Sequence, residues 1–429
     1  MAAEHRALHI LLTNLVLEGW TGSEVNIRDW ATGLQRRGHR PTVYSPQLGP
    51  MAELVRSAAI PVIDDIGRLG EPPDIIHGSH NMPLVVAMAR FPAVPAVAWC
   101  QDWIAWFDVP AKLPGIRRYV AVSDALGDRL VREHAIPRDR VRVVLNAVDL
   151  ARVVPRGPLP ARPARALLYA RDAAHLEPVR VACERAGLAL TALGADREHP
   201  TRDPETAMAA HDIVFASGRG ALEALACGAA VVLCDARGLA GMVTADGLER
   251  CRRLNFGLRL LDRPLTAEAL LAEIARYDPA DAGAVARRVR AEAGLDDQLA
   301  RIEAVYGEAL DEAARDGPPD PAAQGRALAA FLQTWLPRLD ARLPWLEERA
   351  WLTEQLAEAR RNLGQLARLE ALGAELARRC AERDELARRC AEMSASRLWR
   401  LREALAARPA LHGVARRLAG LVAPARRRG

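Results

Sequence analysis

Short apolar runs alternate with amphipathic stretches through the first 150 residues. The apolar runs predict strands at 8–13, 41–45, 60–63, 74–76, 94–99, 118–122 and 141–144. The amphipathic stretches predict helices at 22–37, 51–58, 82–90 and 123–134, the last with Ser123 as its N-cap. A chain that alternates strands and helices in this way folds as a parallel sheet covered by helices on both faces.

A proline-rich segment separates this half of the chain from a second α/β half. Pro155, Pro158, Pro160 and Pro163 fall within nine residues, which is the composition of an extended interdomain linker. Apolar runs resume at 166–170, 188–193, 213–215 and 231–233. We therefore expect the α/β class with two Rossmann-like parallel-sheet domains, residues 1–154 and 155–315. Ligands of such sheets bind outside the carboxyl ends of the strands.

Beyond the Asp-Gly-Pro-Pro-Asp-Pro break at 316–321, the pattern becomes helical and charged. The octapeptide Glu-Leu-Ala-Arg-Arg-Cys-Ala-Glu occurs twice, at 375–382 and 385–392. A ten-residue period turns the apolar stripe by about 80° per repeat, so a long straight coiled coil is not the only solution. For the region 316–395, a coiled coil, a helical hairpin and a helix packed on the body or on a partner subunit all remain open.

Positive charge gathers at the end of the chain. Residues 394–429 contain nine arginines and one glutamate, so the net charge of +5 comes from this segment and the rest is slightly negative. Leucines interleaved with arginines are typical of a basic amphipathic helix. We expect the tail, 396–429, to contact an anionic membrane surface, or residues 331–429 to contact a helical partner. The main body shows no charge pattern for binding nucleic acid.

The cysteines and the N-terminus indicate the compartment. The seven cysteines are scattered and include no C-x-x-C pair, which favours neither a disulfide framework nor a zinc site. The apolar run 7–13 contains His9 and lacks a cleavage site, so it predicts a first strand rather than a signal peptide. No uncharged apolar stretch reaches 18 residues. We expect a cytoplasmic protein, associated with the inner face of the membrane if the tail binds lipid.

The segment 217–228 carries the strongest chemical signal. Ser217 follows an apolar strand, Gly218 and Gly220 bracket Arg219, and a helix follows with Glu223 in its second turn. Free N–H groups at a helix start attract anions, glycines permit close approach, and a guanidinium adds a forked grip on phosphate. A carboxylate one turn further can accept hydrogen bonds from a ribose. The plain alternative is a tight turn with a solvated Arg and Glu.

Candidate residues also follow the strands of the first half. Gly22 and Ser23 begin the helix after the first strand, in a second anion-friendly loop. His77 and His80, and then Gln101 and Asp102, lie where strands of the sheet end, so we expect them at the cleft. The cluster Trp99, Trp103 and Trp106 fits a sugar or lipid-linked acceptor, a hydrophobic lid or a domain interface equally well.

The order of these motifs resembles retaining GT-B glycosyltransferases of the family 4 type, over residues 7 to about 310. The segments that carry the resemblance are 22–24 with 34–39, 74–77, 119–130, 136–149 and 222–231. The resemblance implies a nucleotide-diphosphate sugar as donor, with no metal and no further cofactor. Gly22, Ser23, Arg171 and the loop Ser217–Gly220 would hold the diphosphate, and Glu223 the ribose. Charge on the departing diphosphate would then be neutralised by Arg219 and backbone amides.

Two positions depart from the family pattern. Phe215 stands where the family has an acidic residue that contacts the transferred sugar, and Gln101 stands where it often has a histidine. Because Gln cannot act as a general base, His77 or Asp102 is expected to supply part of the catalytic chemistry. The leading hypothesis is retaining transfer of a sugar to a cell-surface polysaccharide or a lipid-linked acceptor. The alternatives are an inactive GT-B scaffold that recruits a partner through 331–395, and a sugar-nucleotide epimerase.

Overall fold

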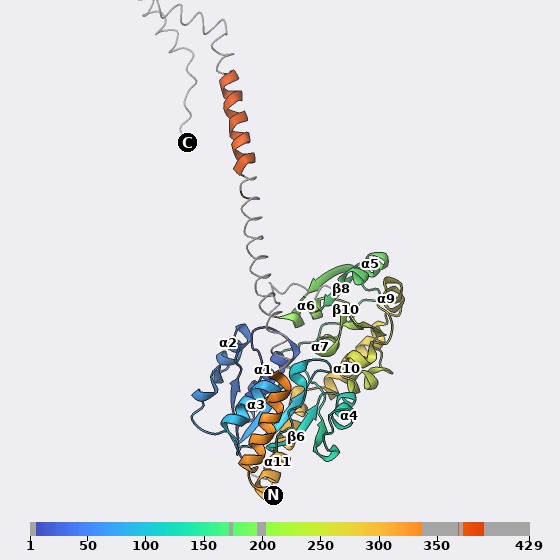
Figure 1. Ribbon diagram of the computed structural model, residues 1–429. Coiled ribbons are helices and arrows are strands. Elements are labelled where there is room, and N and C mark those ends of the chain that lie inside the picture. Colours follow the sequence, from blue (N-terminus) through green and yellow to red (C-terminus); the bar gives the residue numbers. More distant parts are fainter. Residues whose placement is uncertain (1–5, 171–174, 195–202, 337–367, 369–371, 390–429) are drawn as a thin grey trace, which may run out of the picture. The chain divides into compact units, whose positions relative to one another are not determined.

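The computed structural model describes residues 6–170, 175–194, 203–336, 368 and 372–389. The chain divides into two compact units, Met1–Thr334 and Trp335–Gly429, and the first contains both sheets (Figure 1). In the second unit, residues 372–389 form one helix, which covers most of the doubled octapeptide. Arg171 and the basic tail 396–429 lie outside the described residues.

The first sheet is parallel throughout and has the strand order β3-β2-β1-β4-β5-β6-β7. Its strands are β1 (His9–Thr13), β2 (Arg40–Tyr44), β3 (Val62–Ile63), β4 (Ile75–Ser79), β5 (Ala96–Cys100), β6 (Ile116–Ala121) and β7 (Val141–Val143). The central strands β4 and β5 are buried along their whole length, which is why they read as continuous apolar runs.

The second sheet has the order β12-β11-β10-β8-β9, with only the edge strand β12 antiparallel. Its strands are β8 (Arg165–Tyr169), β9 (Ala189–Leu193), β10 (Ile213–Ala216), β11 (Ala230–Asp235) and β12 (Gly238–Met242). The prediction of two parallel-sheet α/β domains with helices at the C-terminus is confirmed, and most of the predicted strands agree with the observed ones to within about two residues.

Helices cover both sheets (Figure 1). Those between the strands of the first sheet are α1 (Gly22–Arg36), α2 (Pro50–Ser57), α3 (Asn81–Arg90) and α4 (Asp124–Arg132). Those that follow are α5 (Leu176–Ala186), α6 (Pro204–Ala210), α7 (Gly218–Cys227), α8 (Leu248–Arg253), α9 (Ala267–Ile274), α10 (Pro279–Glu292) and α11 (Leu295–Asp316). The predicted cap of α4 is confirmed, since the Ser123 hydroxyl accepts a hydrogen bond from the Leu126 amide at 3.2 Å.

Helix α11 returns to the first sheet after the second sheet is complete. It contacts α1 and β6, and its buried side chains Leu299, Ile302 and Tyr306 belong to the first core. We call the first sheet, its covering helices and α11 the first lobe. We call the second sheet and its covering helices the second lobe. The domain boundary at residue 315 remains a prediction, although these α11 side chains pack with the first lobe.

The chain crosses between the lobes twice, and the two crossings lie side by side. Val148 pairs with the Ala293–Leu295 segment through two backbone hydrogen bonds, of 2.8 and 3.0 Å. Among the helices described, none is long and apolar enough to cross a membrane.

Candidate functional site

Helices α1 and α7 meet between the two lobes. Helix α7 begins directly after the central strand β10, and α1 follows β1 after a loop of eight residues. The N-terminal turns of both helices therefore lie on the carboxyl side of their own sheets, where ligands of such sheets bind. Arg219, in the first turn of α7, donates to Asn26 Oδ1 and Asp29 Oδ2, both on α1. Its Nε donates to Glu223 Oε1 at 3.0 Å. The predicted basic residue of the loop therefore lies between the lobes, with every nitrogen of its guanidinium engaged.

Asp29 is the most enclosed charge of this contact, with 2% of its surface exposed. Arg28 also donates to it, at 2.7 and 3.0 Å. Burial alone would raise the pKa of Asp29, but the guanidinium groups of Arg219, Arg28 and Arg152 outweigh burial and hold that pKa below its usual value. Asp29 is therefore a charged, paired carboxylate at neutral pH.

Arg152 joins the same cluster from the segment that follows the first crossing. It lies 3.1 Å from Glu223, 2.9 Å from Glu205 and 3.7 Å from Asp29. Burial would lower the pKa of Arg152, but these carboxylates raise it above its ordinary value. Three arginines, counting Arg28, thus face three carboxylates, and Glu223 is part of a buried ion-pair network rather than a solvated helix residue.

Side-chain amides form a second group beside the ion pairs. Asn26 Nδ2 donates to Gln101 Oε1 at 2.6 Å and to Asn146 Oδ1 at 3.4 Å. Asn146 Nδ2 in turn donates across the lobes to Asn255 Oδ1 at 2.9 Å. Asn255 and the following Phe256 both have positive φ, +57° and +50°, a conformation that costs free energy in non-glycine residues and gathers at functional sites. Gln101 therefore belongs to this group of amides, next to the ion pairs.

Sequence reasoning missed Asn26, Asp29, Arg152 and Asn255. Asn26 and Asp29 lie three residues apart in α1, among the buried apolar residues Val25, Ile27 and Trp30. Polar residues three apart share one helix face, so two of them on a buried face are a signal for a polar contact. Arg152 and Asn255 carry no comparable local signal.

The loop before α1 already holds an anion of its own. Glu24 accepts from the amides of Gly19 and Thr21, at 2.6 and 2.9 Å, and from the Thr21 hydroxyl at 2.6 Å. This is a capping box, in which the third helical residue reaches back to the N-cap. Gly22 and Ser23 occupy the first two positions of the helix, as predicted, but the amides just before them are spent on Glu24.

The loop before α7 uses its two glycines for different purposes. Gly218 has φ +57° and faces open space, and its amide donates to the Phe256 carbonyl at 2.7 Å. Gly220 packs on the second sheet, where an added Cβ would lie 2.6 Å from Tyr169. Ser217 caps nothing; its hydroxyl donates to Asp235 Oδ2 at 3.2 Å. Close backbone approach to a ligand is therefore possible at Gly218, whereas Gly220 is required by packing.

His77 lies in the first core. It is fully buried, its ring stacks on Trp99 with the centroids 4.8 Å apart, and its Nδ1 lies 2.6 Å from the Tyr306 hydroxyl. Burial lowers the pKa of His77 to about 3. This differs from the cleft position expected for it, because His77 is the middle residue of β4 and its ring faces α11. Trp99 is likewise a core residue.

His80 and Asp102 lie at the carboxyl ends of β4 and β5. His80 Nδ1 accepts from the Leu15 amide at 3.1 Å, and burial lowers the pKa of His80 to about 4, against the opposing effect of the nearby Asp102. Asp102 Oδ1 accepts from the amides of Ile104 and Ala105 at 2.6 and 2.8 Å. The loop is closed by Asp108, whose pKa burial and Asp102 raise to about 8. Beside it lies a cavity of about 20 Å³, room for one water.

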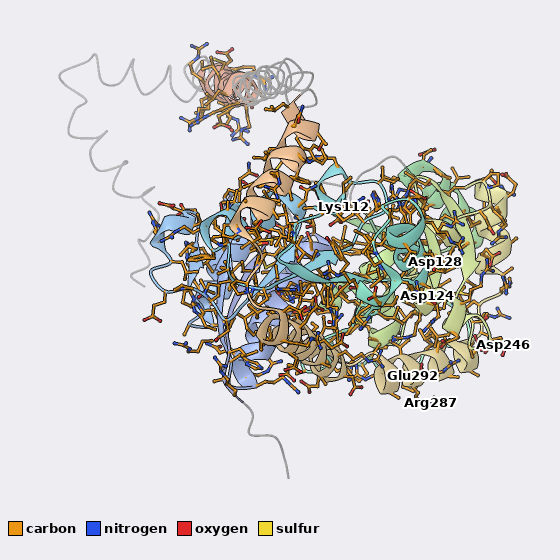
Figure 2. All side chains as sticks on the ribbon, turned by 60° about the horizontal axis from the view of Figure 1, so that its bottom comes forward. Lys112, Asp124, Asp128, Asp246, Arg287 and Glu292 are labelled. Carbon is orange, nitrogen blue, oxygen red and sulfur yellow. The ribbon has the colours of Figure 1, made fainter. Side chains whose placement is uncertain are left out.

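Trp103 belongs to the interface between the lobes. Its ring lies between Arg129 of the first lobe, 4.9 Å from the ring centroid, and Arg259 of the second, at 5.5 Å. Nearby, Arg253 pairs with Asp124 of α4 at 2.6 Å. Figure 2 labels Asp124 on α4, on the side of the first lobe that meets the second. Of the three uses left open for the tryptophans, Trp103 fits the domain interface.

Phe215 is fully buried in the core of the second lobe and belongs to packing. Among the described residues, no group of three or more His, Cys, Asp and Glu side chains has the arrangement of a metal site.

Comparisons with known proteins agree with this architecture. Residues 20–152 match the family model of Glycosyltransferase Family 4. A search of the curated proteins finds no match. Among solved structures, the chain is similar to a glycosyltransferase from Rickettsia africae ESF-5 at 15% identity, covering 71% of this chain and 99% of that one, with a TM-score of 0.53.

Two further solved structures are more distant in shape. The calicheamicin glycosyltransferase CalG4 shares 16% identity over 70% of this chain and 99% of its own, with a TM-score of 0.43. A UDP-N-acetylglucosamine 2-epimerase shares 14% over 73% and 99%, also with a TM-score of 0.43. At these identities the likeness concerns the fold, and only the first structure is close enough in shape to bear on it. The chain thus has the GT-B fold, and residues 20–152 of its first lobe are similar to Glycosyltransferase Family 4.

Proposed function

We propose that this protein transfers a sugar from a nucleotide-diphosphate sugar to a hydroxyl group of an acceptor, at the contact between α1 and α7. The observation that carries the proposal is the position of Arg219, at the start of a helix, between the lobes and beside Arg152 and Arg28. A helix N-terminus with three guanidinium groups at hand suits a diphosphate, whose charge grows as the sugar leaves.

The groups proposed for the donor divide between the lobes. Gly22 and Ser23 are the proposed diphosphate ligands from the first lobe, and Ser217, Gly218, Arg219 and Gly220 are those from the second. Arg171, which lies outside the described residues, is a further proposed ligand. Glu223 accepts from the ribose hydroxyls once Arg219 turns to phosphate. Arginines and amides neutralise the leaving group, so the proposed reaction needs no divalent cation.

The remaining chemistry is retaining transfer, in which the leaving phosphate itself takes the proton of the acceptor hydroxyl. The proposed role of Gln101 and Asp102, which follow the end of β5, is to orient the sugar and the acceptor. His77 is too deeply buried to touch either, so its contribution is to the packing beneath the site. The proposed acceptors are a cell-surface polysaccharide or a lipid-linked saccharide, met at the inner face of the membrane by a cytoplasmic enzyme with a basic tail.

Nucleotide binding tests the proposal. The protein is screened by thermal shift against UDP-, GDP-, dTDP- and ADP-sugars, because a ligand that binds the native state raises its melting temperature. Arg219→Ala and Glu223→Ala should each weaken binding by about 1.5–3 kcal/mol, roughly 10- to 150-fold, through loss of a charge-assisted contact. Arg180→Ala, which removes an exposed arginine of α5, is the control. A wild type without affinity for any of these nucleotides would end the proposal.

A second candidate is a GT-B scaffold that binds sugar nucleotide without turning it over. It is favoured by Phe215, a core residue where the family has an acid that contacts the sugar. The region 331–395, in which 372–389 form a helix, is the proposed site for a partner enzyme. Incubation with sugar nucleotide and acceptor separates the two candidates. Release of nucleoside diphosphate with an intact sugar appearing on the acceptor rejects the scaffold; conversion to an isomeric sugar nucleotide alone would indicate an epimerase.

A further inference from the structure

The guanidinium of Arg219 is the group that a donor diphosphate needs, yet its hydrogen bonds are taken by residues of this chain. Two of its three partners, Asn26 and Asp29, come from the opposite lobe. We propose that Asp29 competes with the diphosphate for Arg219. Through this competition Asp29 sets both the affinity for the donor and the strength of the contact between α1 and α7. The identity of the competing ligand, a nucleoside diphosphate, rests on the proposed function.

Asp29 is suited to this role by its position. It is 2% exposed, it lies on the first lobe, and its Oδ2 contacts Arg219 while Oδ1 is held by Arg28 at 2.7 Å. Glu223 also accepts from Arg219, but it lies one turn away on the same helix and moves with it. Among the described residues, the ion pair between Asp29 and Arg219 is the only one that joins α1 to α7.

A diphosphate and Asp29 cannot both stay close to Arg219, because like charges at short range in a buried site repel strongly. If the diphosphate binds Arg219, Asp29 keeps Arg28 as its counter-ion, and α1 loses its charged contact with α7. Replacing the carboxylate by an uncharged group of the same shape should therefore make the diphosphate bind more tightly.

The experiment is a calorimetric titration of the full chain with UDP, GDP, dTDP and ADP. Asp29→Asn should bind the preferred diphosphate about tenfold more tightly than the wild type. The matched control is Asp212→Asn, which also removes a buried aspartate paired with an arginine, Arg156 at 2.9 Å, but within the second lobe. The control should bind as the wild type does. Equal or weaker binding by Asp29→Asn overturns the proposal.

A double-mutant cycle shows whether the gain acts through Arg219. In the Arg219→Ala background, Asp29→Asn should no longer tighten binding, because the group for which Asp29 competes is gone. If the gain persists there, Asp29 acts only by general repulsion and the proposed competition is wrong.

Small-angle X-ray scattering without nucleotide tests whether the contact between α1 and α7 keeps the two lobes together. Asp29→Asn should have a larger radius of gyration than the wild type and Asp212→Asn, and an unchanged radius overturns the proposal whatever the titrations give. If no variant binds a nucleoside diphosphate but Asp29→Asn expands, the proposed function fails while the link from Asp29 to Arg219 stands. All variants are first shown to unfold cooperatively.

Discussion

Two histidines near the site are held in their neutral form. His77 is enclosed by Trp30, Trp99 and Tyr306, and His80 by Phe107 and the loop after β1. Their folded-state pKa values of about 3 and about 4 lie well below the value of 6.5 that they have when unfolded. Neither is therefore a charged acid at neutral pH, and His80, with Nδ1 bound to an amide, mainly positions the loop that carries Leu15.

These histidines predict a loss of stability in mild acid. As the pH falls below about 6.5, these two histidines bind protons in the unfolded chain but stay neutral in the folded one. The free energy of unfolding therefore falls by about 1.4 kcal/mol per pH unit for each histidine. The fall should continue to about pH 4 for His80 and to about pH 3 for His77. Urea unfolding measured from pH 8 to pH 3 checks this.

His80→Asn is the variant that isolates one histidine, because its amide oxygen can still accept from Leu15. Between pH 6.5 and 4, the slope of the unfolding free energy against pH should be smaller in this variant by about 1.4 kcal/mol per pH unit, the contribution of one histidine. A slope that is the same in the variant and the wild type would mean that His80 titrates normally in the folded protein.

Single residues also show where the sequence was informative. Arg219 and Glu223 were found because they stand in a glycine-bracketed loop at a helix start, which is a local pattern. Their partners Asn26 and Asp29 are 190 or more residues away, and no local spacing encodes a contact made by two lobes. Glu24 and Phe256, which occupy loop amides, were missed for a related reason: a free amide is a property of the folded loop, not of its composition.

At the scale of elements, α7 depends on two glycines for different reasons. Gly220→Ala should destabilise the protein by about 1–3 kcal/mol, because the added Cβ would overlap Tyr169 of β8. Gly218→Ala should cost about 1 kcal/mol through its positive φ alone. Denaturant unfolding measures both. Gly307→Ala is the control: it lies in α11 with nothing within 4 Å of the added Cβ and should be neutral or stabilising. A harmless Gly220→Ala would show that α7 and β8 are not this close.

Helix α11 fastens the first lobe through a buried polar contact as well as through its apolar face. Tyr306→Phe removes the hydroxyl at 2.6 Å from His77 Nδ1 and leaves that nitrogen without its partner, which should cost about 1–3 kcal/mol of unfolding free energy. Tyr277→Phe, which loses a hydroxyl bonded to the Pro160 carbonyl at a more exposed place, should cost less. Equal losses for the two variants in urea unfolding would contradict the special role of the Tyr306 hydroxyl.

For the whole molecule, periodicity was sufficient to predict the class and the two sheets. The apolar runs of β1, β4, β5, β10 and β11 are buried on both faces, so they stand out in any sequence. Periodicity did not show that α11 packs with the first core, because the pattern of an amphipathic helix does not indicate which sheet the helix covers. That choice is made by the paired crossings at Val148 and Ala293–Leu295, which are some 145 residues apart.

The basic tail carries a separate prediction. If residues 396–428 bind an anionic membrane, binding of the protein to vesicles that contain anionic lipid should weaken steeply as salt rises from 0.05 to about 0.5 M, because salt screens the arginines. Sedimentation with vesicles measures this, with neutral vesicles as the control. Binding that is independent of salt, or absent, would assign the tail to a protein partner.

The central claim is that a nucleoside diphosphate lies between the lobes at the start of α7. A crystal structure of the protein with its preferred nucleoside diphosphate tests it most directly. We predict phosphate oxygens within about 3 Å of the Arg219 guanidinium, with Asp29 displaced from that group and the ribose near Glu223. A diphosphate bound outside the interlobe contact, with Arg219 still paired to Asp29, would contradict the account.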